Sequence, residues 1–125
     1  MIKICDPGIK TKYTVADFER AIADFVGYPF AVATNTGTAA LHLALDALGA
    51  DGETVRIPPI CFRAVWNAVR LSHARPIYDS REKLAIDVMN YGFPATHDYK
   101  QILDAAEGLG GDIPDDYQIV TLSFN

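Results

Sequence analysis

Phe30-Ala-Val-Ala-Thr-Asn-Thr-Gly-Thr-Ala-Ala-Leu-His-Leu-Ala-Leu-Asp-Ala-Leu-Gly49 is the stretch that decides the fold of this chain. Residues 30–34 form a short apolar run that predicts a strand, and residues 39–48 are apolar on nearly every side, which predicts a helix sandwiched between layers. The turn between them contains Gly37 flanked by Thr36 and Thr38. A glycine, two hydroxyls and the unpaired N–H groups of a helix start together predict a phosphate site. The alternative is that Thr36 or Thr38 only caps the helix.

Composition limits what such a site can belong to. The chain has 125 residues, half of them hydrophobic and 22% charged, which is typical of one globular domain with a packed core. The net charge is −5 and the basic residues are scattered, so the sequence does not predict a nucleic-acid partner. No run reaches membrane-spanning length and no signal peptide is evident, so we expect a cytoplasmic protein without a membrane partner. Cys5 and Cys61 lack metal-ligand spacing and are expected to be reduced thiols, without a metal or a disulfide.

The rest of the chain alternates helical and strand patterns. Residues 1–13 lack periodicity and predict an N-terminal arm, while residues 14–125 form the domain. Thr14 and Asp17 predict a capping box, and Gly27 ends that helix. A third helix is expected at 62–71, and strands are expected at 54–57, 76–78, 84–89, 101–103 and 118–122. Alternation of this kind predicts an α/β fold with a mostly parallel sheet.

Six motifs in a fixed order suggest a family. They are Asn35-Thr-Gly-Thr-Ala-Ala-Leu41, Pro58 with Phe62, Asn67-Ala68, Tyr91-Gly92, Asp104-Ala-Ala-Glu107 with Gly110, and Ser123-Phe-Asn125. In this order they resemble the N-terminal part of the DegT/StrS family of sugar aminotransferases, from about residue 11 to residue 125. The resemblance implies part of the large domain of a fold-type-I pyridoxal-phosphate enzyme, with a three-layer arrangement of a mostly parallel sheet and flanking helices. It also implies transfer of an amino group from an amino-acid donor to a nucleotide-linked keto sugar, and a homodimer.

The resemblance assigns the phosphate of pyridoxal 5'-phosphate to four residues. Gly37 and Thr38, with Thr36 beside them, match the turn that holds this phosphate, and Ser123 matches a second hydroxyl that binds it. This agrees with the anion site that the residues themselves predict.

Three further residues match positions around the cofactor ring. Phe62 matches an aromatic that stacks on the pyridine ring; the alternative is a core phenylalanine. Asp104 matches the carboxylate that pairs with the protonated pyridine nitrogen, and a carboxylate on a buried strand without a cation is costly. Glu107 matches a position near the phenolic oxygen; the alternative is a solvated turn residue.

The chain also departs from the family pattern. The Schiff-base lysine of the family follows the serine by five residues, so it would fall three positions past Asn125. We therefore assign no catalytic residue and expect the 125 residues alone to be inactive. The segments 80–85 and 94–100 are too short for the family's helices at full length.

Two other functions stay open. One is a non-catalytic α/β domain or subunit that binds pyridoxal phosphate or another phosphate compound. A less favoured one is an unrelated nucleotide-binding domain, although no G-x-G-x-x-G or Walker pattern follows a strand.

Overall fold

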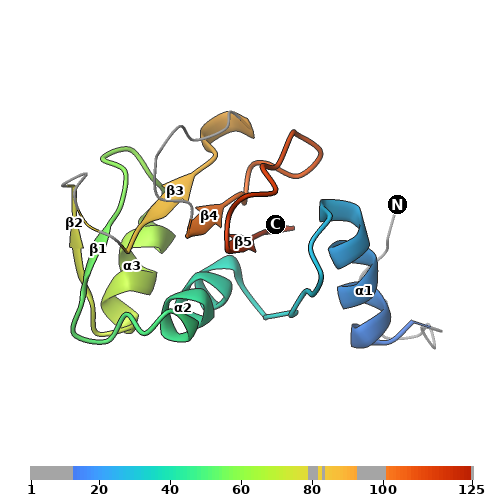
Figure 1. Cartoon of the computed structure of the whole chain (residues 1–125), viewed down its shortest axis with the longest axis horizontal. Coiled ribbons are helices and arrows are strands. Elements are labelled where there is room, and N and C mark those ends of the chain that lie inside the picture. Colours follow the sequence, from blue (N-terminus) through green and yellow to red (C-terminus); the bar gives the residue numbers. More distant parts are fainter. Residues whose placement is uncertain (1–12, 79–81, 83, 93–100, 125) are drawn as a thin grey trace. The chain divides into compact units, whose positions relative to one another are not determined.

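The computed structural model describes residues 13–78, 82, 84–92 and 101–124 (Figure 1). Its contacts divide the chain into two units, Met1–Ala33 and Thr34–Asn125, and each is described by itself. The predicted arm, residues 1–13, lies outside the described residues except for Tyr13, which is exposed. None of the described helices is long and apolar enough to cross a membrane.

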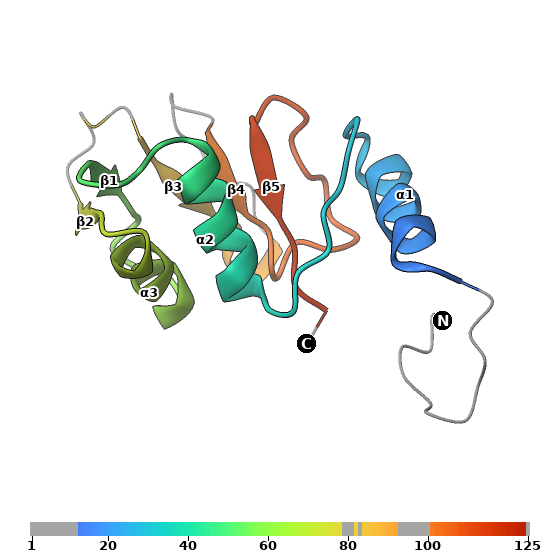
Figure 2. The same cartoon turned by 90° about the horizontal axis from the view of Figure 1, so that it is seen from below.

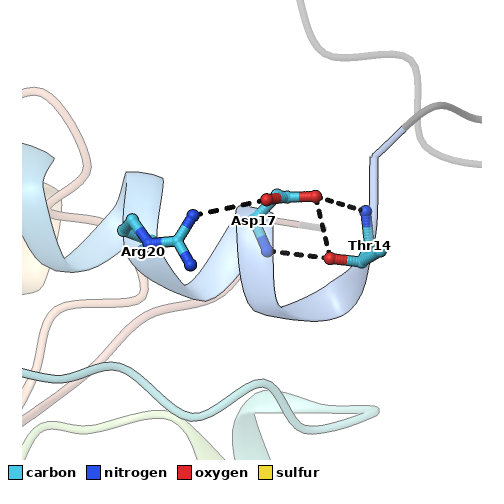
Figure 3. Close-up of polar contacts among 3 residues, drawn as sticks. All are labelled: Thr14, Asp17 and Arg20. Carbon is cyan, nitrogen blue, oxygen red and sulfur yellow. Dashed lines mark hydrogen bonds and ion pairs between the residues drawn. The ribbon is translucent and has the colours of Figure 1, made fainter.

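The first unit contains the predicted N-terminal helix, α1 (Val15–Val26). Thr14 Oγ1 accepts a hydrogen bond from the Asp17 N–H at 3.2 Å, and Asp17 Oδ2 accepts from the Thr14 N–H at 2.9 Å (Figure 3). The Thr14 hydroxyl also donates to Asp17 Oδ2, at 2.8 Å, and the hydrogen bonds that this carboxylate accepts, first from the Thr14 N–H and then from the hydroxyl, lower its pKa. Arg20 extends the cluster with an ion pair to Asp17 at 3.4 Å. Gly27 ends the helix in the left-handed region at φ 75°, so the predicted capping box and stop are confirmed.

The predicted strand at residues 30–34 does not form. Phe30 is 85% exposed and Val32 is 70% exposed, and the Ala33 N–H donates to Glu19 Oε1 at 2.8 Å instead of to a neighbouring strand. A strand requires a partner that accepts its backbone hydrogen bonds, and no described segment pairs with these residues. Apolar composition alone was therefore misleading here.

The second unit holds the remaining elements, which alternate as the sequence predicts. In chain order they are α2 (Gly37–Ala47), β1 (Thr54–Arg56), α3 (Arg63–Leu71), β2 (Arg75–Ile77), β3 (Ile86–Val88), the short 3₁₀ turn η1 (Asn90–Gly92), β4 (Ile102–Asp104) and β5 (Ile119–Thr121). The strand β1 pairs in parallel with β2, and β4 lies between β3 and β5 with both pairings parallel. A single parallel bridge between Arg56 and Ala85 connects the two groups of strands. The α/β class with parallel strands is confirmed.

The core occupies both faces of these strands. Figure 2 shows α2 and α3 on the same side of the strands, where they pack against each other. Leu41, Leu45 and Val65 of these helices form one apolar cluster with Ile86 and Ile102. Strand neighbours point to opposite faces, so Leu103 belongs to a second cluster that includes Met89, Ala105 and Tyr117.

The helix α2 is less enclosed than the sequence predicts. Leu41, Ala44 and Leu45 are buried, whereas Leu43 is 49% exposed and Asp46 and Ala47 are exposed. No described element covers the side of the helix that carries these three residues. The prediction of a sandwiched helix was therefore wrong within the described residues.

Candidate functional site

The predicted site residues gather at one edge of the sheet. Parallel strands place their carboxyl ends at the same edge, which is where ligands bind in open α/β sheets. Asp104 ends β4 and Ser123 follows β5, while Phe62 lies between β1 and α3. All of them belong to the second unit, as do Thr36, Gly37 and Thr38 at the start of α2.

The first turn of α2 lies directly beside the segment after β5. An ideal Cβ atom at Gly37 would lie 3.5 Å from Ser123 Cβ and 3.6 Å from Ser123 Oγ. These residues are separated by most of the sequence, so the fold brings together a helix N-terminus and a hydroxyl that were matched independently to one phosphate. The first N–H groups of a helix have no partner within it, and they favour an anion.

Thr36 caps α2, which was the alternative interpretation of this turn. Its Oγ1 accepts a hydrogen bond from the Ala39 N–H at 3.1 Å, and its backbone is extended at φ −151°. The hydroxyl uses only an acceptor in this contact, so its own proton remains free to donate to an anion. Capping and anion binding are therefore compatible at Thr36.

Asp104 is a buried carboxylate at the end of β4, with 6% of its surface exposed. Burial raises its pKa, and hydrogen bonds from the Ala106 N–H at 3.1 Å and from Thr121 oppose that rise. The nearby negative charge of Glu107 raises the pKa further. Among the residues that the structure describes, Asp104 has no cationic partner. A ligand that brings a positive charge would relieve this arrangement.

The loop before α3 reaches this site. Burial raises the pKa of the Cys61 thiol, and the charge of Asp104 raises it further. The next residue, Phe62, is the N-cap of α3 and is 77% exposed, so it is not the core phenylalanine of the alternative interpretation. Its ring is accessible for stacking, and its role stays a prediction.

Glu107 is exposed, and its carboxylate accepts a hydrogen bond. Its Oε2 accepts a hydrogen bond from the Tyr91 N–H at 2.7 Å, so Glu107 differs from the purely solvated turn residue of the alternative. Asn90 Nδ2 in turn donates to the Ile60 carbonyl oxygen at 3.1 Å. Sequence reasoning did not identify Asn90, and nothing in its local pattern distinguishes it from an ordinary turn asparagine.

A buried ion pair was also not predicted from the sequence. Arg56 Nη2 lies 2.6 Å from Asp87 Oδ1, and the Tyr117 hydroxyl donates to Asp87 Oδ2 at 2.8 Å. Arg56 and Asp87 are 4% and 1% exposed. A charge of each sign within two otherwise apolar strand segments was the signal that could have predicted it.

A separate hollow lies away from this edge. It has a volume of about 520 Å³ and is bordered by Glu53, Glu82 and Gln101, which lie at the amino ends of the strands. Among the described residues that border it, none carries a positive charge that would bind the predicted phosphate, and the hollow lies at the opposite edge from the residues assigned to that phosphate. Within the described residues, no cluster of potential ligands could hold a metal ion.

The family is established by comparison with known proteins. The model of the DegT/DnrJ/EryC1/StrS aminotransferase family matches residues 7–90. The chain belongs to this family. The predicted family is confirmed; it comprises sugar aminotransferases that depend on pyridoxal phosphate.

Individual relatives agree with this assignment. The GDP-perosamine synthase of Caulobacter vibrioides is 42% identical over 64 residues, which cover 50% of this chain and 17% of that protein. The UDP-4-amino-4,6-dideoxy-N-acetyl-beta-L-altrosamine transaminase of Campylobacter jejuni is 35% identical over 78 residues, covering 62% of this chain and 19% of that protein. The chain therefore spans less than a fifth of the length of these curated relatives.

A solved structure extends the likeness to the fold. The crystal structure of NtdA from Bacillus subtilis, with bound cofactor PMP, matches with a TM-score of 0.77 and 29% identity. The match covers 89% of this chain and 33% of that one. The fold class predicted from the sequence is thus confirmed as part of a fold-type-I aminotransferase.

The site residues fit the family's cofactor on structural grounds. The cofactor presents a phosphate and a ring nitrogen that can be protonated, and the sheet edge offers one feature for each. The start of α2 beside Ser123 suits the phosphate, and the buried Asp104 without a cation among the described residues suits the protonated nitrogen.

Proposed function

We propose that this chain binds pyridoxal phosphate at the carboxyl edge of its sheet, as the cofactor-binding part of an aminotransferase for nucleotide-linked keto sugars. The observation that supports it best is the position of Ser123 against Gly37, on the same edge as the buried carboxylate of Asp104. The sequence and the folded chain thus indicate one ligand by separate arguments.

In this proposal the phosphate is held at the start of α2. The N–H groups of Gly37 and Thr38 donate to it, together with the hydroxyls of Thr36 and Ser123. Gly37 lets the phosphate approach the backbone, because a side chain there would occupy the space beside Ser123. The helix dipole adds a favourable interaction with the negative charge.

Asp104 and Phe62 hold the ring. The cofactor, when bound, supplies an electron sink for the carbon that loses a proton during amino transfer. Asp104 keeps the ring nitrogen protonated by accepting its N–H, and this contact offsets the cost of burying the carboxylate. Phe62 presents an exposed ring that covers one face of the cofactor and excludes water.

The substrate and assembly belong to the same proposal. The relatives' names mention GDP-perosamine and a UDP-linked amino sugar, so we infer a nucleotide-linked keto sugar and an amino-acid donor for this protein. We also propose a homodimer and a cytoplasmic location. The position predicted for the Schiff-base lysine lies beyond Asn125, so the 125 residues are tested by binding and not by turnover.

The test uses pyridoxamine 5'-phosphate, which has no aldehyde and so does not react with lysine side chains. Trp66 is the only tryptophan of the chain and lies one helical turn after Phe62, so its fluorescence reports binding by energy transfer to the ligand. We expect saturable quenching, and we expect Gly37→Ala to weaken binding about tenfold, because the added methyl group occupies the space beside Ser123 through which the phosphate approaches the backbone. Asp104→Asn should weaken binding by a similar factor.

Controls and contrary outcomes separate the alternatives. Glu53→Ala, at the opposite edge, should leave the affinity unchanged. A domain that holds a different phosphate compound would respond to Gly37→Ala but not to Asp104→Asn. Absence of binding to the unmodified chain, or affinity that is indifferent to both variants, would overturn the proposal.

A further inference from the structure

We propose that Glu107 is a positioning residue: by holding the Tyr91 N–H it fixes the Asn90–Gly92 turn, and this turn holds the Ile60–Phe62 loop beside Asp104. The part of this inference that concerns the cofactor rests on the proposed function. The part that concerns the loop rests on contacts within the chain. Glu107 thus acts through Tyr91 and Asn90 rather than on the ligand.

Two hydrogen bonds in series connect three segments that are distant in sequence. The first joins Glu107 Oε2, after β4, to the Tyr91 N–H at 2.7 Å. The second joins Asn90 Nδ2, in the same turn as Tyr91, to the Ile60 carbonyl oxygen at 3.1 Å. The series ends at the Ile60 backbone, two residues before Phe62, whose ring is predicted to stack.

The turn requires this support because its backbone is strained. Tyr91 adopts φ 57° and ψ 27°, the left-handed region that bulky residues avoid. Its side chain is 85% exposed, so packing does not compensate for the strain. A hydrogen bond from a backbone N–H to a carboxylate is stronger than one between neutral groups and can hold this conformation. Strained positions of this kind cluster at functional sites.

The loop also lacks strong packing of its own. Ile60 is 76% exposed and Phe62 is 77% exposed, and Cys61 between them is only partly buried. A loop with so little buried apolar surface opens easily unless a polar contact holds it. Asn90 supplies such a contact at the Ile60 carbonyl.

Cys61 provides a readout that needs no cofactor. Its thiol is partly buried, and burial and the Asp104 charge raise its pKa, so it should react slowly with iodoacetamide in the unmodified chain. In Glu107→Ala we expect alkylation of Cys61 to accelerate about fivefold, the factor that corresponds to losing one ordinary hydrogen bond. Peptide mass spectrometry separates Cys61 from Cys5.

The choice of variants separates positioning from charge. Glu107→Gln keeps an oxygen that accepts the Tyr91 N–H but loses the added strength that the charge gives this bond, so we expect a rate nearer to that of the unmodified chain than to that of Glu107→Ala. Asn90→Ala should accelerate alkylation about as much as Glu107→Ala, because each breaks one contact of the same series. The double variant should then be no faster than either single one, which is non-additivity of coupled sites. Glu53→Ala is the control for loss of an exposed carboxylate elsewhere.

Two results would overturn the inference. One is a Glu107→Gln variant that reacts as fast as Glu107→Ala, which would make the charge and not the acceptor responsible. The other is an unchanged Cys61 rate in both Asn90→Ala and Glu107→Ala. Circular dichroism and urea unfolding of each variant verify that the fold is retained.

Affinity for pyridoxamine 5'-phosphate then tests the consequence for the cofactor. We expect Glu107→Ala and Asn90→Ala each to weaken it about fivefold, while Glu107→Gln retains it. If the unmodified chain binds no pyridoxamine phosphate, the proposed function fails while the alkylation rates still decide the positioning role. If it binds but the alanine variants bind equally well, the positioning role for the ring fails and the proposed function stands.

Discussion

Two buried aspartates on neighbouring parallel strands have opposite surroundings. Asp87 in β3 is 1% exposed and contacts Arg56 at 2.6 Å and the Tyr117 hydroxyl at 2.8 Å. Asp104 in β4 is 6% exposed and is hydrogen-bonded by Ala106 and Thr121, with no cation among the described residues. Asp87 lies opposite Leu103 in the register, so the two carboxylates point to different faces of the sheet.

The difference separates a structural carboxylate from one suited to a ligand. Burying a carboxylate costs several kcal/mol unless a partner compensates, and Asp87 has its partners within the chain. Asp104 has hydrogen bonds but no compensating charge, so folding leaves part of that cost uncompensated. Residues that retain such a cost are candidates for function.

The largest expected effect on stability is for a substitution at Asp87. Asp87→Asn removes the negative charge beside Arg56 and leaves a buried cation unpaired, so we expect a loss of about 3–5 kcal/mol in unfolding free energy. The double variant Arg56→Met with Asp87→Leu should recover most of this loss, because no charge then remains buried. Urea denaturation measures both. A double variant as unstable as Asp87→Asn would show that the pair itself is not the cause.

A smaller loss of unfolding free energy is expected for a substitution at Tyr117. Tyr117→Phe removes the hydroxyl that donates to Asp87 but leaves Arg56 in place, so we expect a loss of about 1–2 kcal/mol. The same denaturation experiment checks it. No measurable loss would mean that Arg56 alone satisfies Asp87.

The same aspartate-to-asparagine change at Asp104 should raise the free energy of unfolding instead of lowering it. Burial raises the pKa of Asp104, so the folded chain binds more protons than the unfolded chain, and this group's contribution to stability falls as pH rises through the raised pKa. Asp104→Asn should therefore stabilise the ligand-free chain at neutral pH by about 1 kcal/mol, the common scale of single substitutions. It should also flatten the stability profile above the ordinary carboxyl range. If Asp104→Asn lowers stability and leaves its pH dependence unchanged, the contrast between Asp87 and Asp104 is contradicted.

The smallest effect on stability is expected at Thr121. Its hydroxyl acts on Asp104 as the hydroxyl of Tyr117 acts on Asp87. Its hydroxyl lowers the pKa of Asp104, so Thr121→Val should raise that pKa further and change stability by less than about 1 kcal/mol. The measurement is the pH at which the fall in stability levels off, because this marks the folded-state pKa of Asp104, and it should move upward. A shift downward would show that the hydroxyl does not support the charged carboxylate.

Much of the fold was predictable because local chemistry decides it. The Thr14 capping box, the Gly27 stop and the helices α2 and α3 follow from signals within a few residues. The strand expected at 30–34 failed because a strand depends on a partner that its own sequence does not specify. The Arg56–Asp87 pair was missed for a related reason, since it joins strands that are 31 residues apart.

The candidate site was predictable to a different extent. Motif order matched Gly37 and Ser123 to one ligand, and the fold places them side by side. The contact of Glu107 with the Tyr91 N–H could not be predicted, because it depends on a left-handed backbone at a tyrosine, which no sequence pattern favours. Pattern reading can indicate which residues form a site, but not how a turn of unfavourable backbone geometry is held.

Among the described residues, the parallel bridge between Arg56 and Ala85 is the only one that connects the two groups of strands, so the sheet consists of two halves. One half, β1 and β2 with α3, carries Phe62; the other, β3 to β5, carries Asp104 and Ser123. Helix packing joins the halves on one face, and the Arg56–Asp87 pair joins them on the other. A ligand bound by Phe62 and Asp104 together would therefore act as a cross-link, and its binding free energy would add directly to the cohesion of the two halves.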